Sequence, residues 1–182
     1  MKKKVLVPLA DGTEMIEALS VVDVFRRAGI EVDTASVNEL VITSSHGVKI
    51  EADKLIGDCL DTEYDLVVIP GGIPGAENMR ESADLVHILK KQKQAHKMYG
   101  AICAAPAVVL EQIGLLEGKT ATCHPLFVAD LDSNRFSEDK VVVDGLCVTS
   151  RGAGTAVDFA LTLLGLVAGE ETKQNVAQGM AL

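Results

Sequence analysis

Residues 99–114 read YGAICAAPAVVLEQIG, and this stretch joins a hydrophobic run to a helix-forming run with no turn residue between them. The hydrophobic run covers residues 98–102 and stops at Cys103, where helix-forming residues begin at once. In a strand–turn–helix elbow, the residue in the sharp turn is exposed at the top of the sheet and can serve as a nucleophile. The stretch therefore predicts a strand, a tight turn occupied by a cysteine, and a helix.

Short apolar runs alternate with helical patterns on both sides of this stretch. We expect strands at residues 4–10, 30–37, 64–72, 97–103 and 119–123, hairpins at 40–53 and 140–150, and helices at 14–27, 82–95, 105–114, 154–169 and 171–181. Asp11 is the expected N-cap of the first helix, with Glu14 at the capping-box position. This alternation predicts an α/β fold whose open, mostly parallel sheet has helices on both faces. No linker or repeat divides residues 1–182, so we expect a single domain.

The composition excludes several classes of protein. Hydrophobic residues make up 48% of the 182 residues but aromatic residues only 3%, so the core must be aliphatic. The net charge of −9 argues against a nucleic-acid surface, which needs a basic face. No stretch approaches the roughly 20 apolar residues that span a bilayer, and the first apolar run is too short for a signal peptide. We expect a cytoplasmic protein that binds neither nucleic acid nor membrane.

The four cysteines, Cys59, Cys103, Cys123 and Cys147, form no CxxC pair. This spacing indicates reduced thiols rather than a disulfide framework or a zinc site. No H-x-x-H pair or carboxylate cluster suggests a metal, and the motif GGIPGAE lacks the spacing of a phosphate-binding loop. Cys123 and Cys147 fall in expected strands and suit packing, whereas Cys59 lies in a polar segment and is expected at the surface.

Cys103 is the first candidate for chemistry. Ligands of doubly wound sheets bind beyond the carboxyl ends of the strands, where Cys103 and the turns at residues 11–17 and 70–76 converge. A helix N-terminus favours the thiolate, so we expect a depressed pKa for Cys103. The main-chain N–H groups of Ala104 and Gly72 are candidate donors to an oxyanion. The alternative is a buried small hydrophobe, which describes most free cysteines.

Glu17 and His124 are the second and third candidates. Glu17 has apolar neighbours in the first helix, so burial would raise its pKa and suit it to general acid–base catalysis. The alternative is an exposed glutamate that complements the helix dipole. His124, in the segment TCHPLF, could act as a base or orient Cys103, and the alternative is a structural loop residue. The segment SRGAGTA suits either a small anion or a tight structural turn.

Five segments occur in the order of a known family: DGTEMIEAL, VVIPGG, AICAAPAVVL, TCHP and SRGAGTAVDFAL. In this order they resemble the ThiJ/PfpI superfamily, and within it the DJ-1 branch that includes the Parkinson disease protein deglycase. The resemblance runs from about residue 4 to residue 167. It implies a flavodoxin-like three-layer sandwich, commonly a homodimer.

The resemblance also assigns roles at the site. It implies that Cys103 is the nucleophile, that Glu17 forms a hydrogen bond with it, that His124 lies nearby, and that the amides of Gly72 and Ala104 bind the oxyanion. The implied chemistry needs no cofactor and acts on dicarbonyls such as methylglyoxal or on their early adducts with proteins. In the expected scheme, the Cys103 thiolate forms a hemithioacetal and a protonated Glu17 moves a proton between the two carbons.

Several positions depart from related patterns. The intracellular-protease branch has a histidine directly after the cysteine, where this chain has Ala104, which argues against a peptidase. Glutamine amidotransferases of related fold have a late His-x-Glu pair, but His124 is followed by proline and leucine. Three further positions differ from the common DJ-1 pattern, namely His46, Met15 and Ala153, and they weigh against an anion pocket at a dimer interface.

Two other functions remain open from the sequence. The same thiol suits a redox sensor or an oxidation-triggered chaperone, because a reactive cysteine can be oxidised reversibly or to the sulfinic acid. Thiazole monophosphate metabolism for thiamine synthesis is a third label attached to this family. It ranks last because no phosphate-transfer motif supports it.

Overall fold

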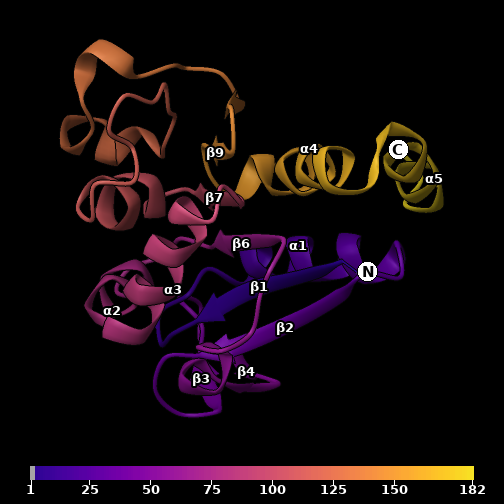
Figure 1. Ribbon diagram of the computed structural model, residues 1–182, viewed down its shortest axis with the longest axis horizontal. Coiled ribbons are helices and arrows are strands. Elements are labelled where there is room, and N and C mark those ends of the chain that lie inside the picture. The colour runs from indigo at the N-terminus through magenta and orange to yellow at the C-terminus, as the bar shows by residue number, and fades with distance from the viewer. Residues whose placement is uncertain (1–2) are drawn as a thin grey trace.

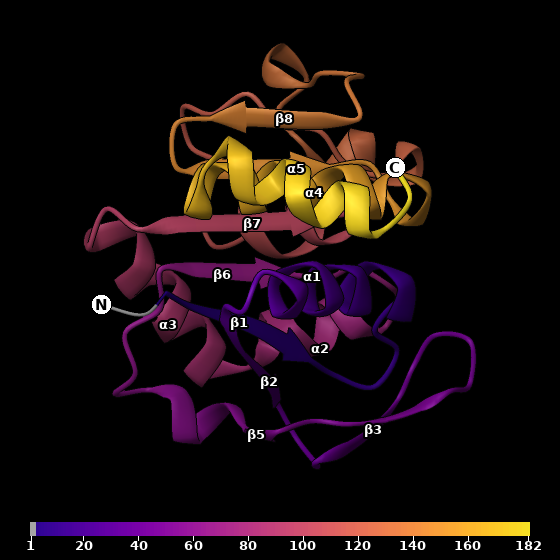
Figure 2. The same ribbon diagram turned by 90° about the vertical axis from the view of Figure 1, so that its right-hand side faces the viewer.

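A mostly parallel sheet forms the centre of the protein. The computed structural model describes residues 3–182, apart from the side chain of Ser133. The seven strands lie in the order β5-β2-β1-β6-β7-β9-β8. Figure 2 shows all but β9 in this sequence, and β9, labelled in Figure 1, lies between β7 and β8. Their bounds are β1 Lys4–Leu9, β2 Glu31–Ser36, β5 Lys54–Leu55, β6 Leu66–Ile69, β7 Met98–Ile102, β8 Val141–Asp144 and β9 Cys147–Ser150. Strands β8 and β9 pair antiparallel, and the other neighbours pair parallel.

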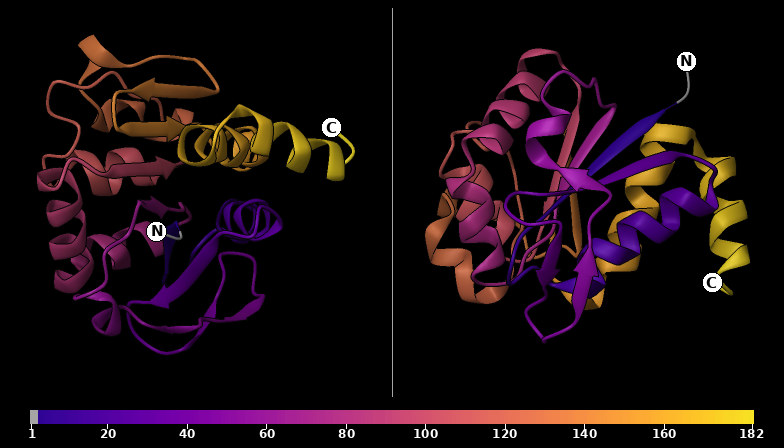
Figure 3. Two further views of the ribbon diagram at one scale, coloured as in Figure 1. Left: turned by 45° about the vertical axis from the view of Figure 1, so that its right-hand side comes forward. Right: turned by 90° about the horizontal axis from the view of Figure 1, so that it is seen from below.

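Helices cover both faces of this sheet. One layer consists of α1 (Met15–Arg27), α4 (Ala156–Ala168) and α5 (Glu170–Gly179), and the other contains α2 (Gly75–Glu81), α3 (Ala83–Gln94) and the π-helix η2 (Pro106–Glu111). Figure 1 shows the elements along the chain, and Figure 3 shows the sheet between the two helical layers. The expected flavodoxin-like α/β sandwich is therefore confirmed.

The sheet is buried on both faces, which explains why its strands read as continuous apolar runs. In β1, Val5 and Val7 belong to the core beneath α1 and α4, whereas Leu6 between them belongs to the core beneath α2 and α3. This alternation follows from the two-residue period of a strand. Both cores are mainly aliphatic, as the low aromatic content predicts.

Shorter elements complete the fold. The hairpin expected at residues 40–53 is confirmed as β3 (Val41–Thr43) and β4 (Lys49–Glu51), which form a sheet of their own. Four 3-10 segments lie in the connections: η1 Ile56–Cys59, η3 Pro125–Asp130, η4 Ser133–Arg135 and η5 Ala153–Thr155. Within residues 3–182, the helices are too short or too polar to cross a membrane.

Two local predictions are wrong, and one helix was missed. Asp11 does not cap α1, because its carboxylate accepts the Thr43 N–H at 2.7 Å, and Glu14 is the N-cap instead. Residues 119–123 form no strand, because their β-type pairing consists of one isolated bridge between Ala121 and Phe136. Helix α2 was not expected, because a segment of seven residues that begins with glycine carries little helical periodicity.

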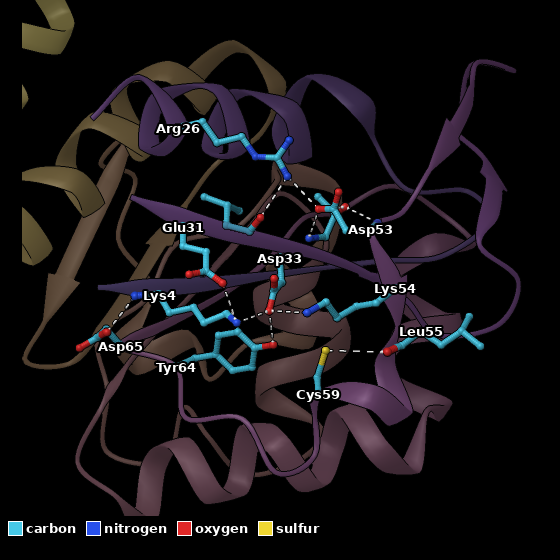
Figure 4. Close-up of polar contacts among 12 residues, drawn as sticks. Lys4, Arg26, Glu31, Asp33, Asp53, Lys54, Leu55, Cys59, Tyr64 and Asp65 are labelled. Atoms are coloured by element: carbon cyan, nitrogen blue, oxygen red, sulfur yellow. Dashed lines mark hydrogen bonds and ion pairs between the residues drawn. The ribbon is translucent and has the colours of Figure 1, made fainter. Parts of the chain in front are cut away.

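An ionic cluster around the buried Asp33 lies at the β5 edge of the sheet. The Asp33 carboxylate accepts the Tyr64 hydroxyl at 2.7 Å and lies 3.1 Å from the Nζ atoms of both Lys4 and Lys54 (Figure 4). Burial alone would raise the pKa of Asp33, but these donors outweigh it and lower the pKa. Cys59 lies beside this cluster and is fully buried, which corrects the expectation of a surface thiol.

Candidate active site

The carboxyl ends of four adjacent strands define the site. Strands β1, β6, β7 and β9 are neighbours that run parallel, so the segments that follow them leave the sheet at the same edge. Cys103 follows β7, Gly71 follows β6, and Gly152 follows β9. The predicted convergence of the first turn, the glycine turn and the cysteine elbow is therefore observed.

Cys103 occupies the elbow in a left-handed backbone conformation. Its φ is +66°, which is uncommon for a residue with a side chain. Two main-chain hydrogen bonds hold it there: its N–H donates to the Ser150 carbonyl at 3.0 Å, and its carbonyl accepts the His124 N–H at 2.8 Å. The elbow is thereby bonded to the two segments that flank the site. Strained conformations of this kind occur preferentially at functional sites.

The tight approach of the β6 turn requires a glycine. A Cβ atom on Gly71 would lie 2.6 Å from Cβ of Cys103 and 2.9 Å from Oε2 of Glu17. Such a Cβ would force these side chains or the elbow backbone to move. Gly71 therefore allows the β6 turn, Cys103 and Glu17 to meet.

Glu17 is placed by a ring of three hydrogen bonds, which we call the Glu14 ring. Glu14 N–H donates to the Gly71 carbonyl at 2.9 Å, and Gly71 N–H donates to Oε2 of Glu17 at 2.8 Å. Glu17 N–H closes the ring by donating to Oε2 of Glu14 at 2.9 Å. The Glu17 side chain is 1% exposed, and its second oxygen, Oε1, is buried without a hydrogen-bond partner. The ring therefore fixes one carboxylate oxygen and leaves the other free beside Cys103.

Burial raises the pKa of Glu17 to about 7, as the sequence predicts. The Gly71 N–H, which donates to the carboxylate, and the neighbouring Cys103 thiol oppose this rise, and the negative charge of Glu14 adds to it. The free glutamate value is 4.5, so Glu17 changes protonation near neutral pH rather than in acid. A group that titrates in this range suits general acid–base chemistry.

The expected depression of the thiol pKa is wrong. Burial raises the pKa of Cys103 to about 12, and the charge of the Glu17 carboxylate adds to the rise. The N–H groups of Gly72 and Ala104 lower it, but they do not compensate for burial and a neighbouring negative charge. Between about pH 7 and pH 12 the pair of Cys103 and Glu17 therefore holds one proton, on the thiol when Glu17 is ionised.

His124 lies across the site from Glu17. Its Nδ1 accepts the Leu126 N–H at 3.2 Å, so the neutral ring carries its proton on Nε2. A Cβ atom placed on Gly152 would be 3.4 Å from Cδ2 of His124 and 3.8 Å from Sγ of Cys103. The structure thus brings His124, Cys103 and Glu17 around one point. In this tautomer His124 can donate a hydrogen bond from Nε2, but it cannot act there as a base.

Comparison with known proteins agrees with this geometry. The model of the DJ-1/PfpI family matches residues 3–166. The chain belongs to the DJ-1/PfpI family. Protein DJ-1 homolog B of Arabidopsis thaliana is 43% identical over 177 residues, which cover 96% of this chain and 40% of that protein. The chain therefore spans less than half the length of this relative.

Two other members of the DJ-1/PfpI family match over nearly their whole length. The protein named glutathione-independent glyoxalase DJR-1.2 of Caenorhabditis elegans is 30% identical over 180 residues, which cover 98% of this chain and 95% of that protein. The structure of oxidized Toxoplasma gondii DJ-1 has a TM-score of 0.96 and 43% identity, and 98% of each chain is covered. The family thus includes a member named as a glyoxalase.

The hairpin turn places a histidine beside the Glu14 ring. His46, in the turn of the β3–β4 hairpin, has its Nδ1 3.0 Å from Oγ of Ser45 and 3.9 Å from Oε1 of Glu14. It therefore faces the Glu14 ring from outside the site. Within residues 3–182, no cluster of three or more His, Cys, Asp or Glu side chains is arranged to hold a metal ion.

Three contributors were missed from the sequence. Gly71 was not separated from Gly72, Glu14 was assigned only to a capping box, and Gly152 was placed in a turn whose role stayed open. Two signals were available: the paired glycines after a buried strand, and a glycine two residues after the end of the strand beside the elbow. Neither signal shows which of these residues touches Cys103, because that depends on how separate loops pack.

Proposed function

We propose that this protein is a glyoxalase that needs neither glutathione nor another cofactor and converts methylglyoxal to lactate at Cys103. One observation carries the proposal: the Cys103 thiol and the free Oε1 of Glu17 lie together at an elbow where the N–H groups of Gly72 and Ala104 interact with Sγ. The glyoxalase name of the Caenorhabditis elegans relative supports it.

The first step forms a covalent adduct. Sγ of Cys103 bonds to the aldehyde carbon while its proton passes to the Glu17 carboxylate, and the carbonyl electrons move onto oxygen. The N–H groups of Gly72 and Ala104 stabilise this oxyanion until the proton on Glu17 neutralises it. The product is a hemithioacetal, and the Glu17 carboxylate is free again. This order differs from the expected scheme, because the proton starts on Cys103 and Glu17 acts first as the base.

The second stage moves a proton between two carbons. The Glu17 carboxylate removes the hydrogen from the former aldehyde carbon, which gives an enediolate, and returns this proton to the neighbouring carbon. The hydroxyl proton of the adduct passes to the second oxygen of the substrate, which gives a thioester of lactic acid. His124 donates a hydrogen bond from Nε2 to the second oxygen of the substrate. Water then cleaves the thioester and restores the thiol, so that one methylglyoxal and one water give one lactic acid. For a glycated amine, the same steps would also release the amine.

The test compares lactate formed from methylglyoxal, without glutathione, by the wild type and two variants. We expect Cys103→Ala to abolish turnover and Glu17→Gln to lower kcat by a factor of about 10²–10⁴, the usual contribution of a general acid–base group. Cys147→Ala and Glu77→Gln are matched controls outside the site and should keep activity. Turnover retained by Cys103→Ala, or absent from the wild type, would reject the proposal.

A second candidate function is peroxide sensing, with a chaperone activity that begins when Cys103 is oxidised. Cys103 is partly exposed, whereas Cys59, Cys123 and Cys147 are buried, so an oxidant reaches Cys103 first. The oxidized state of the Toxoplasma gondii structure is consistent with this chemistry in a relative. Peroxide titration with mass analysis of Cys103, followed by a client-aggregation assay, tests it. Oxidation without any change in aggregation would reject the chaperone.

We also propose that the protein is a homodimer through the outer face of α1. Ile16 and Leu19 on this face are 51% and 41% exposed, and with Met15 they line a shallow apolar hollow. The hairpin turn lies against the same end of α1, because Ser45 N–H donates to the Thr13 carbonyl at 2.9 Å. A second copy that covers this face would lie next to Glu14 and His46.

A further inference from the structure

Gly152 lies at the centre of the three side chains that carry the proposed chemistry. A Cβ atom on this residue would be 3.4 Å from Cδ2 of His124, 3.8 Å from Sγ of Cys103 and 3.9 Å from Oε1 of Glu17. No other glycine of the described chain points its missing side chain at all three groups. A methyl group at this position would therefore fit in contact with the nucleophile, the acid–base carboxylate and the imidazole.

The fold does not require a glycine at this position. The φ and ψ of Gly152 are 160° and −169°, an extended conformation that any residue adopts. The three distances are ordinary van der Waals contacts, so an alanine would fit without moving the backbone. This contrasts with Gly71, where a Cβ would lie 2.6 Å from Cβ of Cys103. Neither the backbone conformation nor the packing around Gly152 therefore requires a glycine at this position.

The position of the space matches what the reaction needs. A carbon that is about to be attacked lies roughly 3–3.5 Å from the nucleophile, with the proton carrier within reach. The Cβ position of Gly152 is close to this distance from Sγ and is about equally far from Oε1 of Glu17. A methyl group held there would occupy the volume in which the reacting carbons of a small dicarbonyl must lie.

We propose that Gly152 is a specificity-determining residue, whose missing side chain provides the space for the carbon chain of the substrate beside Cys103, Glu17 and His124. The inference rests on the proposed glyoxalase function and adds to it the residue that limits the size of the substrate. We expect the site to accept short α-oxoaldehydes, in which the second carbonyl carbon carries hydrogen or methyl. A larger substituent on that carbon would not fit beside the three side chains and would have to point toward solvent.

The test is Gly152→Ala, with Gly154→Ala as the matched control. Gly154 lies in the same turn, two residues further along, and a Cβ on it would meet no atom within 4 Å. We expect both variants to fold like the wild type, as judged by circular dichroism and thermal unfolding. For Gly152→Ala, kcat/KM with methylglyoxal should fall at least about tenfold, with a smaller fall for glyoxal and a larger one for phenylglyoxal. Equal effects on the three aldehydes, or no effect, would overturn the inference.

A second readout does not depend on turnover. The rate at which Cys103 reacts with hydrogen peroxide and with iodoacetamide is measured in the wild type and in Gly152→Ala by mass spectrometry. We expect the variant to slow the reaction with iodoacetamide, the larger reagent, more than the reaction with peroxide. The ratio of the two rates, iodoacetamide to peroxide, does not require an active enzyme. If the wild type converts none of the aldehydes, the proposed function fails, but this ratio still tests whether Gly152 leaves space beside Cys103. An unchanged ratio would overturn the inference even if the enzyme is active.

Discussion

At the scale of single residues, burial governs the chemistry of Cys103 and Glu17. Both groups lose water when the protein folds, which disfavours their charged forms and raises both pKa values. Above about pH 7 the pair therefore carries one negative charge and one proton rather than two negative charges. Attack by the thiol then requires a short proton transfer to Glu17 rather than a free thiolate.

The raised pKa of Glu17 makes the protein less stable at high pH. Below pH 4.5 the carboxyl is protonated in both the folded and the unfolded chain, so this cost is absent. Between pH 4.5 and about 7 the unfolded chain releases the proton while the folded protein keeps it, and the free energy of unfolding falls. Above about pH 7 the loss is complete and amounts to about 3 kcal/mol for this shift.

Glu17→Gln removes this titration. We compare the free energy of unfolding of the variant with that of the wild type. This difference should grow in favour of the variant by about 3 kcal/mol as the pH rises from acid to mildly alkaline, because only the wild type then has a buried charge at position 17. Urea unfolding of both proteins below pH 4.5 and above pH 7 measures the difference. Glu77→Gln, on the exposed side of α2, is the control and should show no such gain. A difference independent of pH would contradict the assignment.

At the scale of elements, the start of α1 is the part of the fold that controls the acid–base group. The N-cap of this helix is a glutamate, and its carboxylate accepts the N–H of Glu17 while its charge lies close to the Glu17 side chain. The groups that face Glu17 are Cys103 from the elbow, Glu14 from the cap and His124 across Gly152. His46 faces Glu14 from the hairpin turn.

Glu14→Gln separates the charge of the cap from its hydrogen bond. The amide oxygen can still accept the Glu17 N–H, but the negative charge that raises the pKa of Glu17 is gone. Because turnover requires the singly protonated pair, wild-type activity should rise as the pH increases through about 7. We call this rise the acidic limb of the pH profile. In the variant the acidic limb should move to lower pH, as measured by the pH dependence of kcat/KM for methylglyoxal.

Glu14→Ala serves as the comparison, because it removes both the charge and the hydrogen bond. It should shift the same limb and also destabilise the protein by about 1 kcal/mol, the usual cost of losing an N-cap. If the limb stays in place in Glu14→Gln, the charge of the cap does not control Glu17.

At the scale of the whole molecule, the proposed homodimer predicts how the mass in solution responds to a charge on the outer face of α1. The apolar residues on the outer face of α1 have no partner within the described chain, and a second copy would cover them. We expect light scattering to give twice the mass of the chain for the wild type and the mass of one chain for Leu19→Glu, because burying a charge in this interface is costly.

Val143→Glu is the matched control for this experiment. Val143 is 47% exposed on β8, at the far edge of the sheet from β5, so the same charge placed there should leave the dimer intact. A monomeric wild type would reject the dimer. Dissociation of both variants would show that the added charge acts through something other than the face of α1.

Much of the architecture could be predicted because it depends on local patterns. The apolar run at residues 98–102 forms β7 over the expected residues, and the periodic segment at 82–95 forms α3 with Ser82 as its cap. Predictions failed where a distant partner decided the outcome. Asp11 is a residue type that often caps helices, but its carboxylate accepts the Thr43 N–H instead. Cys59 lies in a polar segment but is buried beside Asp33 and Tyr64.

The sequence by itself determined the alternation of strands and helices, the cysteine at the elbow, and the resemblance that names Glu17 and His124. These follow from the order of residues along the chain and from the periods of strands and helices. The tertiary structure alone decided that Glu14 orients Glu17, that the thiol pKa is raised rather than lowered, and that Gly152 leaves space between the three side chains. The reason is physical: desolvation and close contact depend on which segments pack together, and those segments lie far apart in the sequence.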